Sequence, residues 1–436
     1  MAGDTAGMAK KFRPYVPEQY LLLPPSISDW LPEGHLARFV SDVVEQLDLS
    51  EIEDVYSEER GYPPYNPRMM TKVLLYAYAT GTYASRRMAK QLVDSVAFRY
   101  LASGNHPDFR TISGFRKRHG TALSGLFDQV LDLCQSAGLV KLGRVAVDGT
   151  KIKANASKHK AMSYGRMAKK KTEIREEVRR IFEEAERIDE EEDRLYGEDK
   201  SGDELPEELQ TQAGRLKKIR EAMAELKKRA KNKAEAEGKD PQKAKPAKGD
   251  QYNFTDPESR IQKTSDGFIQ GYNVQIAVDA HAQVIVGQHV AQNSPDAPQL
   301  MPAINQVCQR FNRVPKQVLA DAGYWSESNV WELRKKNIDP YIPPERIKHG
   351  DAAVPAPRGR KPRQMSMKAR MQRKLRTIRG RAIYASRKIL PEPVFGQIKQ
   401  ARGFRQFLRR GLIAVGQEWS LISTAHNILK LHGATT

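Results

Sequence analysis

The sequence predicts an α/β protein in which a mixed sheet carries acidic residues, an all-helical region precedes the sheet, and a helical hairpin is inserted into it. Three observations support this fold class. Residues 144–157 alternate like a buried strand around Asp148, and residues 272–286 alternate like a β-hairpin. Between residues 174 and 230, apolar residues recur in steps of four and three, the spacing of paired helices.

Length and charge limit the function of such a fold. The chain has 436 residues, which suggests two or three domains with ample material for a core. Its 73 Lys and Arg residues exceed its 53 Asp and Glu residues, giving a formal charge of +20. A balance this basic favours a polyanionic partner, either nucleic acid or an anionic membrane surface. Membrane binding is the weaker alternative, because the basic segments lack a strongly apolar opposing face.

Apolar runs and cysteines indicate the compartment. The sequence has no apolar run of about 18 residues and no hydrophobic stretch typical of a signal peptide, so neither a membrane-spanning nor a secreted protein is expected. Cys134 and Cys308 are the only cysteines, which excludes a disulfide framework and a Cys-based zinc site. We therefore expect a cytoplasmic protein in a reducing compartment.

Residues 1–140 are expected to form an all-helical N-terminal domain. Helical spacing begins near residue 29, Pro67 and Gly81 fit the start and end of a second helix, and Ser85 fits an N-cap. Residues 111–119 and 123–133 predict two more helices. Basic residues on these helices are available for DNA phosphates: Arg86, Arg87, Lys90, Arg116, Lys117 and Arg118. Both a DNA-binding helix-turn-helix and a plain helical bundle with solvated charges fit this pattern.

Residues 141–436 are expected to form the second domain, interrupted at 160–250 by an insertion. Within it, two heptad-patterned segments at 174–195 and 209–230 predict an antiparallel coiled-coil hairpin. DNA contact, dimerisation and a solvated spacer are all possible roles. Residues 231–250, rich in Lys, Ala, Pro and Gly, predict a flexible basic linker.

The remaining elements follow in order. A β-hairpin should turn at residues 279–283, where Asp279 and His281 fit a polar turn better than a catalytic role. A helix at 297–311, strands at 318–320 and 339–343, and a closing amphipathic helix at 419–431 come after it. Between Asp351 and Glu392 there is no acid but thirteen Lys and Arg residues. Such a run is often a solvated face, yet it leads into Glu392, which favours a phosphate-binding role.

Three acids stand out because each lies in or beside an apolar segment. Asp148 interrupts a strand, Asp321 ends an apolar run, and Glu392 opens another. Burying a lone carboxylate is costly unless a cation accompanies it, and hard divalent ions prefer carboxylate oxygens. Acids converging from two strands and a helix suit a two-metal phosphodiester enzyme. Glu418 is the rival third acid, although a glutamate at a helix start is also explained by the helix dipole.

These residues resemble a known family, the bacterial insertion-sequence transposases of the DDE type, which have an RNase H-like catalytic domain. The resemblance rests on residues 148–157 (Asp-Gly-Thr-Lys-Ile-Lys-Ala-Asn-Ala-Ser), 320–324 (Ala-Asp-Ala-Gly-Tyr) and 392–399 (Glu-Pro-Val-Phe-Gly-Gln-Ile-Lys). The region from Asp29 through the Phe115 helix also resembles the N-terminal domain of these transposases. The resemblance therefore covers nearly the whole chain.

The resemblance implies roles for individual residues. It assigns Asp148, Asp321 and Glu392 to two Mg²⁺ ions, for which Mn²⁺ can substitute. Many members share a signature of Tyr, Arg, Glu and Lys, which Tyr384, Arg387, Glu392 and Lys399 match. Four residues separate Arg387 from Glu392 where the signature has three, so Lys388 is an alternative for the Arg position. A helical step of seven residues would place Lys399 on the face of Glu392, where it could grip a phosphate. Arg402 continues this basic, DNA-binding segment.

The implied activity is transposition. Such an enzyme binds the terminal inverted repeats of its element, cuts a strand to expose a 3′-hydroxyl and joins it to target DNA, as a homodimer in the DNA complex associated with the bacterial nucleoid. Tyr324 and Trp325 could stack on an unpaired base or serve as core aromatics. Two other classes stay open: a two-metal nuclease or resolvase that cuts without joining, and an inert DNA-binding derivative.

Overall fold

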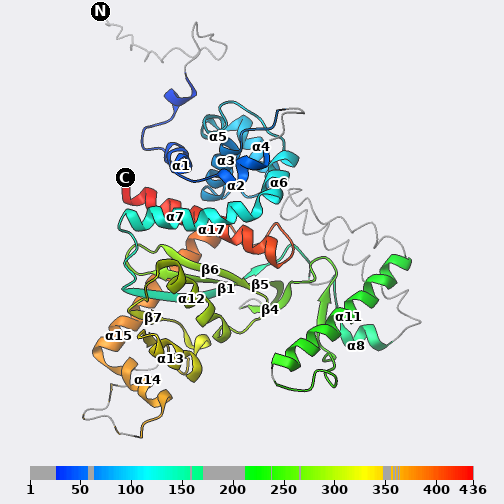
Figure 1. The fold of residues 1–436 in the computed structure, drawn as a ribbon, viewed down its shortest axis with the longest axis vertical. Helices are drawn as coiled ribbons and strands as arrows, with labels where there is room; N and C mark the ends of the chain where they lie inside the picture. The colour runs from blue at the N-terminus through cyan, green and yellow to red at the C-terminus, as the bar shows by residue number, and fades with distance from the viewer. Residues whose placement is uncertain are drawn as a thin grey trace, which may run out of the picture.

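The computed structural model describes residues 26–56, 63–157, 160–169, 212–236, 238–264, 267–346, 355–356, 359, 362 and 364–435. The expected heptad helix at 174–195 lies outside the described residues, as does part of the basic run before Glu392. Within the described residues the fold is a mixed α/β fold of the RNase H-like type, preceded by a helical N-terminal region (Figure 1).

The sheet has the strand order β4-β5-β1-β7-β8, with β6 also paired to β5. β1 lies between an antiparallel neighbour, β5, and a parallel neighbour, β7, and β7 continues parallel to β8. The expected β-hairpin is confirmed as β5 and β6. The strands are β1 (Arg144–Lys153), β4 (Arg260–Thr264), β5 (Gly267–Asp279), β6 (Ile285–Ala291), β7 (Gln317–Leu319) and β8 (Asp339–Tyr341).

Asp279 serves the hairpin turn, as the sequence favoured. Its carboxylate accepts hydrogen bonds from the backbone N–H of Leu142, at 2.7 Å, and of His281, at 2.8 Å. These bonds tie the turn to the segment that enters β1 and satisfy a side chain that is only 1% exposed. Asp279 is therefore a structural residue at the end of the sheet opposite to the acids.

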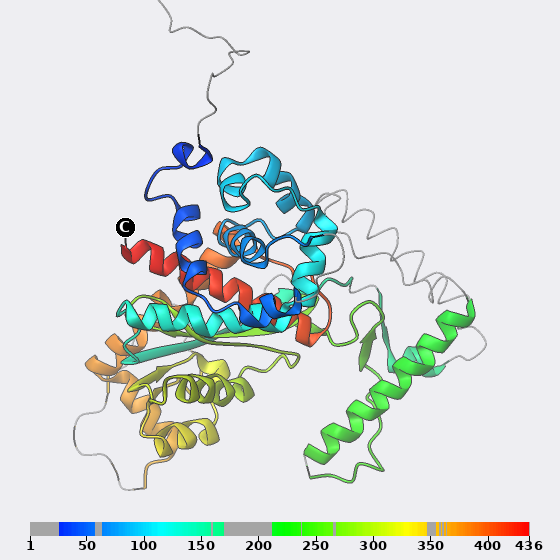
Figure 2. The same ribbon diagram turned by 45° about the horizontal axis from the view of Figure 1, so that its top comes forward.

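Helices cover both faces of the sheet. Figures 1 and 2 show α7 and α17 across one face and α12 and α13 on the other. α12 begins after a 3₁₀ turn, η4 (Ala297–Gln299), and α13 after another, η5 (Ala322–Tyr324). These helices are α7 (Gly120–Ser136), α12 (Leu300–Phe311), α13 (Glu327–Lys335) and α17 (Leu412–Thr435).

The N-terminal region is helical, as predicted, with two differences in where helices begin. Asn66 caps α3 by accepting from the N–H groups of Arg68 and Met69, with Pro67 in the first turn. α6 begins at Phe109, before the expected helix at 111–119, and Asp108 caps it. Ser85, the expected N-cap, is instead the first residue of α4, which has no side-chain cap. The helices here are η1 (Ile27–Trp30), α1 (Leu36–Glu45), α2 (Ser50–Glu53), η2 (Asp54–Tyr56), α3 (Pro67–Ala79), α4 (Ser85–Asp94), α5 (Val96–Leu101) and α6 (Phe109–Arg118).

The closing helix is not amphipathic, which corrects the sequence-based expectation. In α17 every residue from Glu418 to Ile428 is buried, because the helix lies between the sheet and α7 and α3. Its polar residues are satisfied inside: Asn427 bonds to both the N–H and the C=O of Ile285 on β6. One hydrophobic core therefore joins the N-terminal helices, α17 and the sheet.

The insertion has a small core of its own and projects to one side (Figure 1). Ile219, Ala222 and Leu226 of α11 (Gln212–Ala236) pack against Met162 and Met167. α11 continues to Ala236, so the expected flexible linker does not begin at 231; its first residues are helical. The other elements of the insertion are β2 (Ala161–Ser163), α8 (Tyr164–Lys169) and β3 (Gln251–Asn253).

The chain after β8 leads to the third acid through short helices. In the described part of the basic run, α14 buries Met371 and Leu375, so this segment is not simply a solvated face. The final elements are α14 (Met367–Arg376), α15 (Ile378–Ala385), η6 (Ser386–Ile389), α16 (Pro391–Gly396) and the π-helical turn η7 (Gln397–Ala401). None of the helices in the described residues is long and apolar enough to cross a membrane.

Glu418 joins the N-terminal helices to the end of the chain. It is fully buried and accepts hydrogen bonds from the N–H groups of Leu408 and Arg409, at 3.0 and 3.1 Å. Burial raises the pKa of Glu418, and the nearby Arg116 guanidinium opposes that rise. Arg116 itself is 6% exposed and donates to the Tyr78 hydroxyl. Arg116 is therefore not available to DNA phosphates, contrary to the sequence-based expectation.

Replacing Glu418 should destabilise the whole fold. Glu418→Ala leaves two buried N–H groups without an acceptor and removes the acid facing Arg116, so we expect the free energy of unfolding to fall by about 3 kcal/mol. Urea unfolding followed by circular dichroism measures the change. Glu51→Ala, at an exposed position of α2, is the control and should shift stability by less than about 1 kcal/mol. Equal midpoints for the two variants would contradict this role.

Candidate active site

The register of β1 and β7 brings two of the three acids together. The paired residues are Arg144 with Gln317, Val145 with Val318 and Ala146 with Leu319. Continued by two residues, this parallel register sets Asp148 beside Asp321, just where β7 ends. Asp321 is held there as the N-cap of η5, its carboxylate accepting from the N–H of Gly323 at 2.8 Å.

Arg387 connects the third acid to this pair. Its Nη1 lies 3.4 Å from Asp148 Oδ2, and its Nη2 lies 3.3 Å from Glu392 Oε1. The side chains of Asp148 and Arg387 are 16% and 14% exposed, whereas Glu392 is half exposed. Glu392 stands in the first turn of α16, where the helix dipole favours an acid. One guanidinium therefore bridges the strand acid and the helix acid.

The electrostatics of the site centre on Asp148. Burial raises the pKa of Asp148 to about 7, the Arg387 guanidinium opposes the rise, and the carboxylates of Asp321 and Glu392 add to it. Negative groups that raise one another's pKa lie near enough to repel. Gathering these acids is thus unfavourable without positive charge, which Arg387 supplies in this structure.

Arg387, and not Lys388, lies beside Tyr384. The Arg387 guanidinium lies over the Tyr384 ring, 6.0 Å from its centroid, and lies within reach of the acids. Burial raises the pKa of Tyr384, so its hydroxyl stays protonated. Lys388 is exposed on η6. The longer interval between Arg387 and Glu392 is taken up by this 3₁₀ turn.

Lys399 contacts β1 two residues beyond Asp148. Its Nζ donates to Thr150 Oγ1 at 2.5 Å and to the backbone carbonyl of Lys151 at 3.2 Å. Burial, with a contribution from Arg405, lowers the pKa of Lys399. The predicted seven-residue helical step is not regular, because α16 gives way to the π-helical turn η7 after Gly396. Lys399 nevertheless contacts β1 directly. Glu392 is connected to Asp148 on β1 by Arg387.

Arg402 and Glu418 lie apart from the cluster of acids. The Arg402 side chain is buried, at 9% exposure, and its Nε bonds to the carbonyl of Gln397, so this guanidinium is not presented at the surface for a DNA contact. Glu418 belongs to the buried contact with Arg116 and cannot replace Glu392. Tyr324 is fully buried with its hydroxyl on Gln275, which fits the core alternative rather than stacking on a base.

A polar network that sequence reasoning missed supports the acids from β5. Asp296 Oδ1 accepts from Lys151 Nζ at 3.0 Å, from Asn273 at 2.8 Å and from Gln275 at 3.0 Å. Asn273 and Gln275 are fully buried amides that alternate with the apolar Val274 and Ile276 on β5. That contrast was visible in the sequence, since a buried amide on a strand needs a partner.

Asp296 also reaches toward Asp321. A Cβ atom built on Gly323 would lie 3.0 Å from Asp321 Oδ1 and 3.6 Å from Asp296 Oδ2. The two carboxylates therefore approach the same glycine, and a larger residue there would crowd Asp321. Asp296 follows the end of β6 in the chain, so only the folded sheet brings it beside Asp321.

The donor set suits a divalent cation. Asp148, Asp321 and Glu392 offer carboxylate oxygens, the ligands that hard ions such as Mg²⁺ prefer, and their mutual repulsion is relieved by positive charge. Among the described residues, no three acidic, histidine or cysteine side chains stand close enough to form a ready metal-binding group. In this structure the Arg387 guanidinium contacts both Asp148 and Glu392.

Comparison with protein families gives two matches. Residues 25–118 match a family described as a transposase domain, and residues 227–428 match one described as a transposase DDE domain. No curated protein and no solved structure matches the chain. The second range contains Asp321 and Glu392, while Asp148 precedes both the insertion and the start of that range. β1 is thus separated in sequence from the rest of its sheet.

The raised pKa of Asp148 predicts a pH-dependent stability. An aspartate titrates near 3.9 when unfolded and here near 7, so the folded state binds the proton more tightly. The stabilisation is fully present below pH about 4 and is lost as the pH rises through 7. Asp148→Asn removes this dependence and should gain stability relative to the wild type by at most about 4 kcal/mol between pH 4 and pH 8.

Urea unfolding of both proteins in EDTA at a series of pH values measures this difference. Asp94→Asn, at an exposed position of α4, is the matched control and should show no such trend. A constant difference between Asp148→Asn and the wild type across the pH range would show that Asp148 is ionised throughout.

Proposed function

Because this chain belongs to the insertion-sequence transposases of the DDE type, which act on DNA, we propose that it cuts its own element free and inserts it elsewhere. In this proposal the protein binds the terminal inverted repeats, hydrolyses one strand at each end to expose a 3′-hydroxyl, and joins that hydroxyl to target DNA. Both steps are in-line displacements at phosphorus.

The juxtaposition of Asp148, Asp321 and Glu392 carries this proposal. Two acids meet through the β1–β7 register, and the third reaches them through Arg387. These three residues would hold the divalent ions that DDE transposases use, with two Mg²⁺ ions proposed here and Mn²⁺ as a substitute. Such ions activate the attacking oxygen and stabilise the leaving oxygen when bound.

The chain's own residues would position the DNA strand. Lys399 lies beside Thr150, one strand repeat from Asp148, where its ammonium can contact a phosphate next to the cut. Arg387 contacts Tyr384 and two of the acids. With divalent ions on those carboxylates, its guanidinium would be free to donate to a phosphate oxygen instead. The Lys151–Asp296 ion pair would hold β1 against the segment that follows β6.

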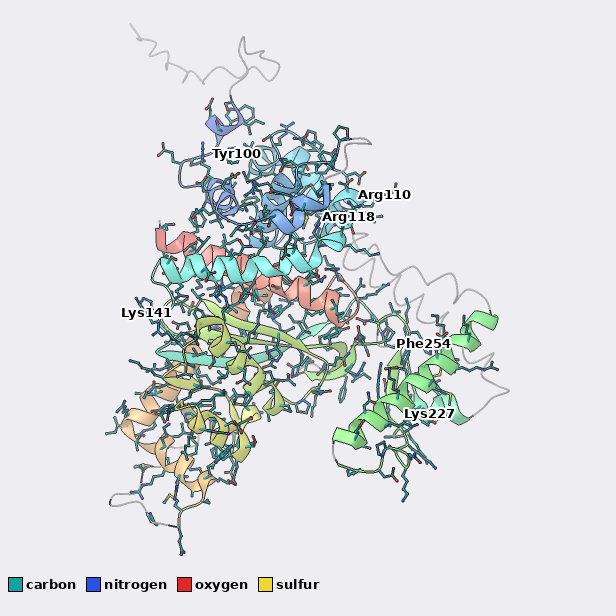
Figure 3. All side chains as sticks on the ribbon, viewed as in Figure 1. Tyr100, Arg110, Arg118, Lys141, Lys227 and Phe254 are labelled. Atoms are coloured by element: carbon teal, nitrogen blue, oxygen red, sulfur yellow. The ribbon has the colours of Figure 1, made fainter. Side chains whose placement is uncertain are left out.

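Two copies are proposed for the DNA complex, since the two element ends must be cut and joined together. α11 projects from the body of the fold and is a candidate for that contact (Figure 1). Its outer surface carries Lys227, which Figure 3 shows on the projecting arm. DNA contact by the same arm is the competing role.

Replacing the three acids one at a time tests the proposal. Asp148→Ala, Asp321→Ala and Glu392→Ala should each abolish nicking and strand transfer of labelled element-end DNA with Mg²⁺, because each removes carboxylate oxygens from the metal site. DNA binding should persist in all three. Glu327→Ala, an exposed acid of α13, is the control and should retain activity.

Each result has a definite meaning. Nicking without joining by the wild type would replace the proposal with a two-metal nuclease. Activity in Glu392→Ala would show that another acid serves as the third ligand, and Asp296, beside Asp321, is then the residue to replace. Binding with neither reaction in the wild type would indicate an inert DNA-binding derivative.

The Lys151–Asp296 pair predicts a smaller effect. Lys151→Met removes the cation that pairs with Asp296, so β1 loses its ion pair with the segment that follows β6 without losing a metal ligand. We expect strand cleavage to slow by roughly 10-fold, the usual scale for residues that support metal ligands. Kinetics at saturating DNA measure the change, with Lys335→Met on α13 as the control. An unchanged rate would make the pair purely structural.

A further inference from the structure

A basic groove lies between the N-terminal helices and the catalytic part of the chain. It encloses about 530 Å³ and is lined by α4, α6, Asn155 and residues 406–410. Figure 3 shows Arg110 at the edge of the N-terminal helices, on the side where α11 projects. Neither half of the chain forms this groove alone, so it depends on the shared core.

Its charge points to a polyanion. Besides the buried Arg116, which bonds to Tyr78, five cationic side chains line the groove: Arg86, Arg110, Lys117, Arg409 and Arg410. None of the described residues lining it is acidic. The buried Glu418 behind the wall interacts electrostatically with Arg116 and Arg409. Clustered cations of this kind attract nucleic-acid phosphates.

The rim is held in a fixed arrangement by an aromatic ring. The Arg86 and Arg110 guanidinium groups lie 4.9 and 5.5 Å from the centroid of the Phe109 ring. Guanidinium groups stacked on an aromatic ring keep their charge while losing rotational freedom. Two cations at the mouth of the groove are therefore oriented before any partner arrives.

Gly114 stands in the interior of α6 and lies on the surface of that helix. A Cβ built on it would meet no described atom within 4 Å. Gly114 and Ser113 line the groove, so the small residues leave room for an outside backbone against the helix.

The groove is connected to the acids through β1. Asn155 donates to the Leu408 carbonyl at 3.0 Å and accepts from Arg410 at 2.9 Å, and it lies seven residues after Asp148. At ~3.3 Å per residue for an extended chain, seven residues reach at most about 23 Å, so the groove lies within that distance of Asp148. Duplex DNA rises by roughly 3.4 Å per base pair, so this limit corresponds to about seven base pairs.

We propose that this groove binds the sugar–phosphate backbone of duplex DNA, on the same duplex that is cut and within about seven base pairs of the cut. The position relative to the cut rests on the proposed function; the binding of duplex DNA does not. The N-terminal helices thereby measure a fixed distance from the acids and set which phosphate reaches them.

The first test uses the two solvent-facing helix glycines. Gly114→Leu fills the groove, whereas Gly125→Leu makes the same change on α7, where a Cβ also meets no described atom. Both variants should keep or raise Tm, because leucine favours a helix. Affinity for a random-sequence duplex, measured in EDTA, should fall about tenfold for Gly114→Leu only. Equal affinity of both variants with the wild type would overturn the proposal.

The second test removes charge. Arg110→Ala with Lys117→Ala should lower the slope of log affinity against log salt by about 2, since each phosphate contact contributes ~0.9. Arg313→Ala with Arg334→Ala removes two exposed cations elsewhere and should leave the slope unchanged. Equal slopes for the two double variants would overturn the groove as a phosphate site.

Ethylation interference then locates the contact. On a duplex of the DNA flanking the coding sequence, ethylated phosphates about two to seven base pairs from the cut should weaken wild-type binding but not binding by the Arg110→Ala, Lys117→Ala variant. If the variant loses ethylation interference only at the phosphates next to the cut, the proposed distance between the groove contact and the cut is wrong. If the wild type never cuts but the salt slopes differ, the groove stands and the transposase proposal fails.

Discussion

The parallel register between β1 and β7 is the constraint on which the site depends. It sets Asp148 and Asp321 side by side at the end of a short strand, in a place where burial raises the pKa of Asp148 to about 7. Two carboxylates in such surroundings repel each other and favour any nearby cation. The remaining polar residues of the site can be understood as responses to that repulsion: Arg387 bridges Asp148 to Glu392, and Lys151 neutralises Asp296.

This arrangement explains why the site needs an extensive polar support. Asn273 and Gln275 are buried on β5, and both donate to the Asp296 carboxylate, while Tyr324 bonds to Gln275. A buried amide without a partner would cost stability, so these residues are stable only as a connected set. The set links the strand of the first acid, the loop of Asp296 and the turn that carries the second acid. A change at one member should therefore move the others.

The N-terminal helices and the catalytic part form one body through α17. The helix is buried along Glu418 to Ile428 between the sheet and α7, and Glu418 connects residues 408 and 409 to Tyr78 and Arg116 of the N-terminal helices. Because one core holds both parts, a DNA duplex bound at the N-terminal helices has a fixed relation to the acids. A flexible tether would not provide that relation.

The sequence by itself predicted β1, the β-hairpin of β5 and β6, α12, β7 and β8, and it singled out three acids, because periodicity and acids within apolar runs are local signals. It did not predict β4 or the short helices α13, α14 and α15. It could not determine that Asp296 approaches Asp321, that Arg116 and Arg402 are buried, or that α17 is enclosed on all sides. Those outcomes depend on which surfaces meet in the fold: Asp296 and Asp321 are brought together by sheet pairing, and α17 loses its solvent face to α7 and α3. Periodicity predicts the secondary structure and the apolar face of a single element. Which other elements cover that element is decided only by the tertiary structure.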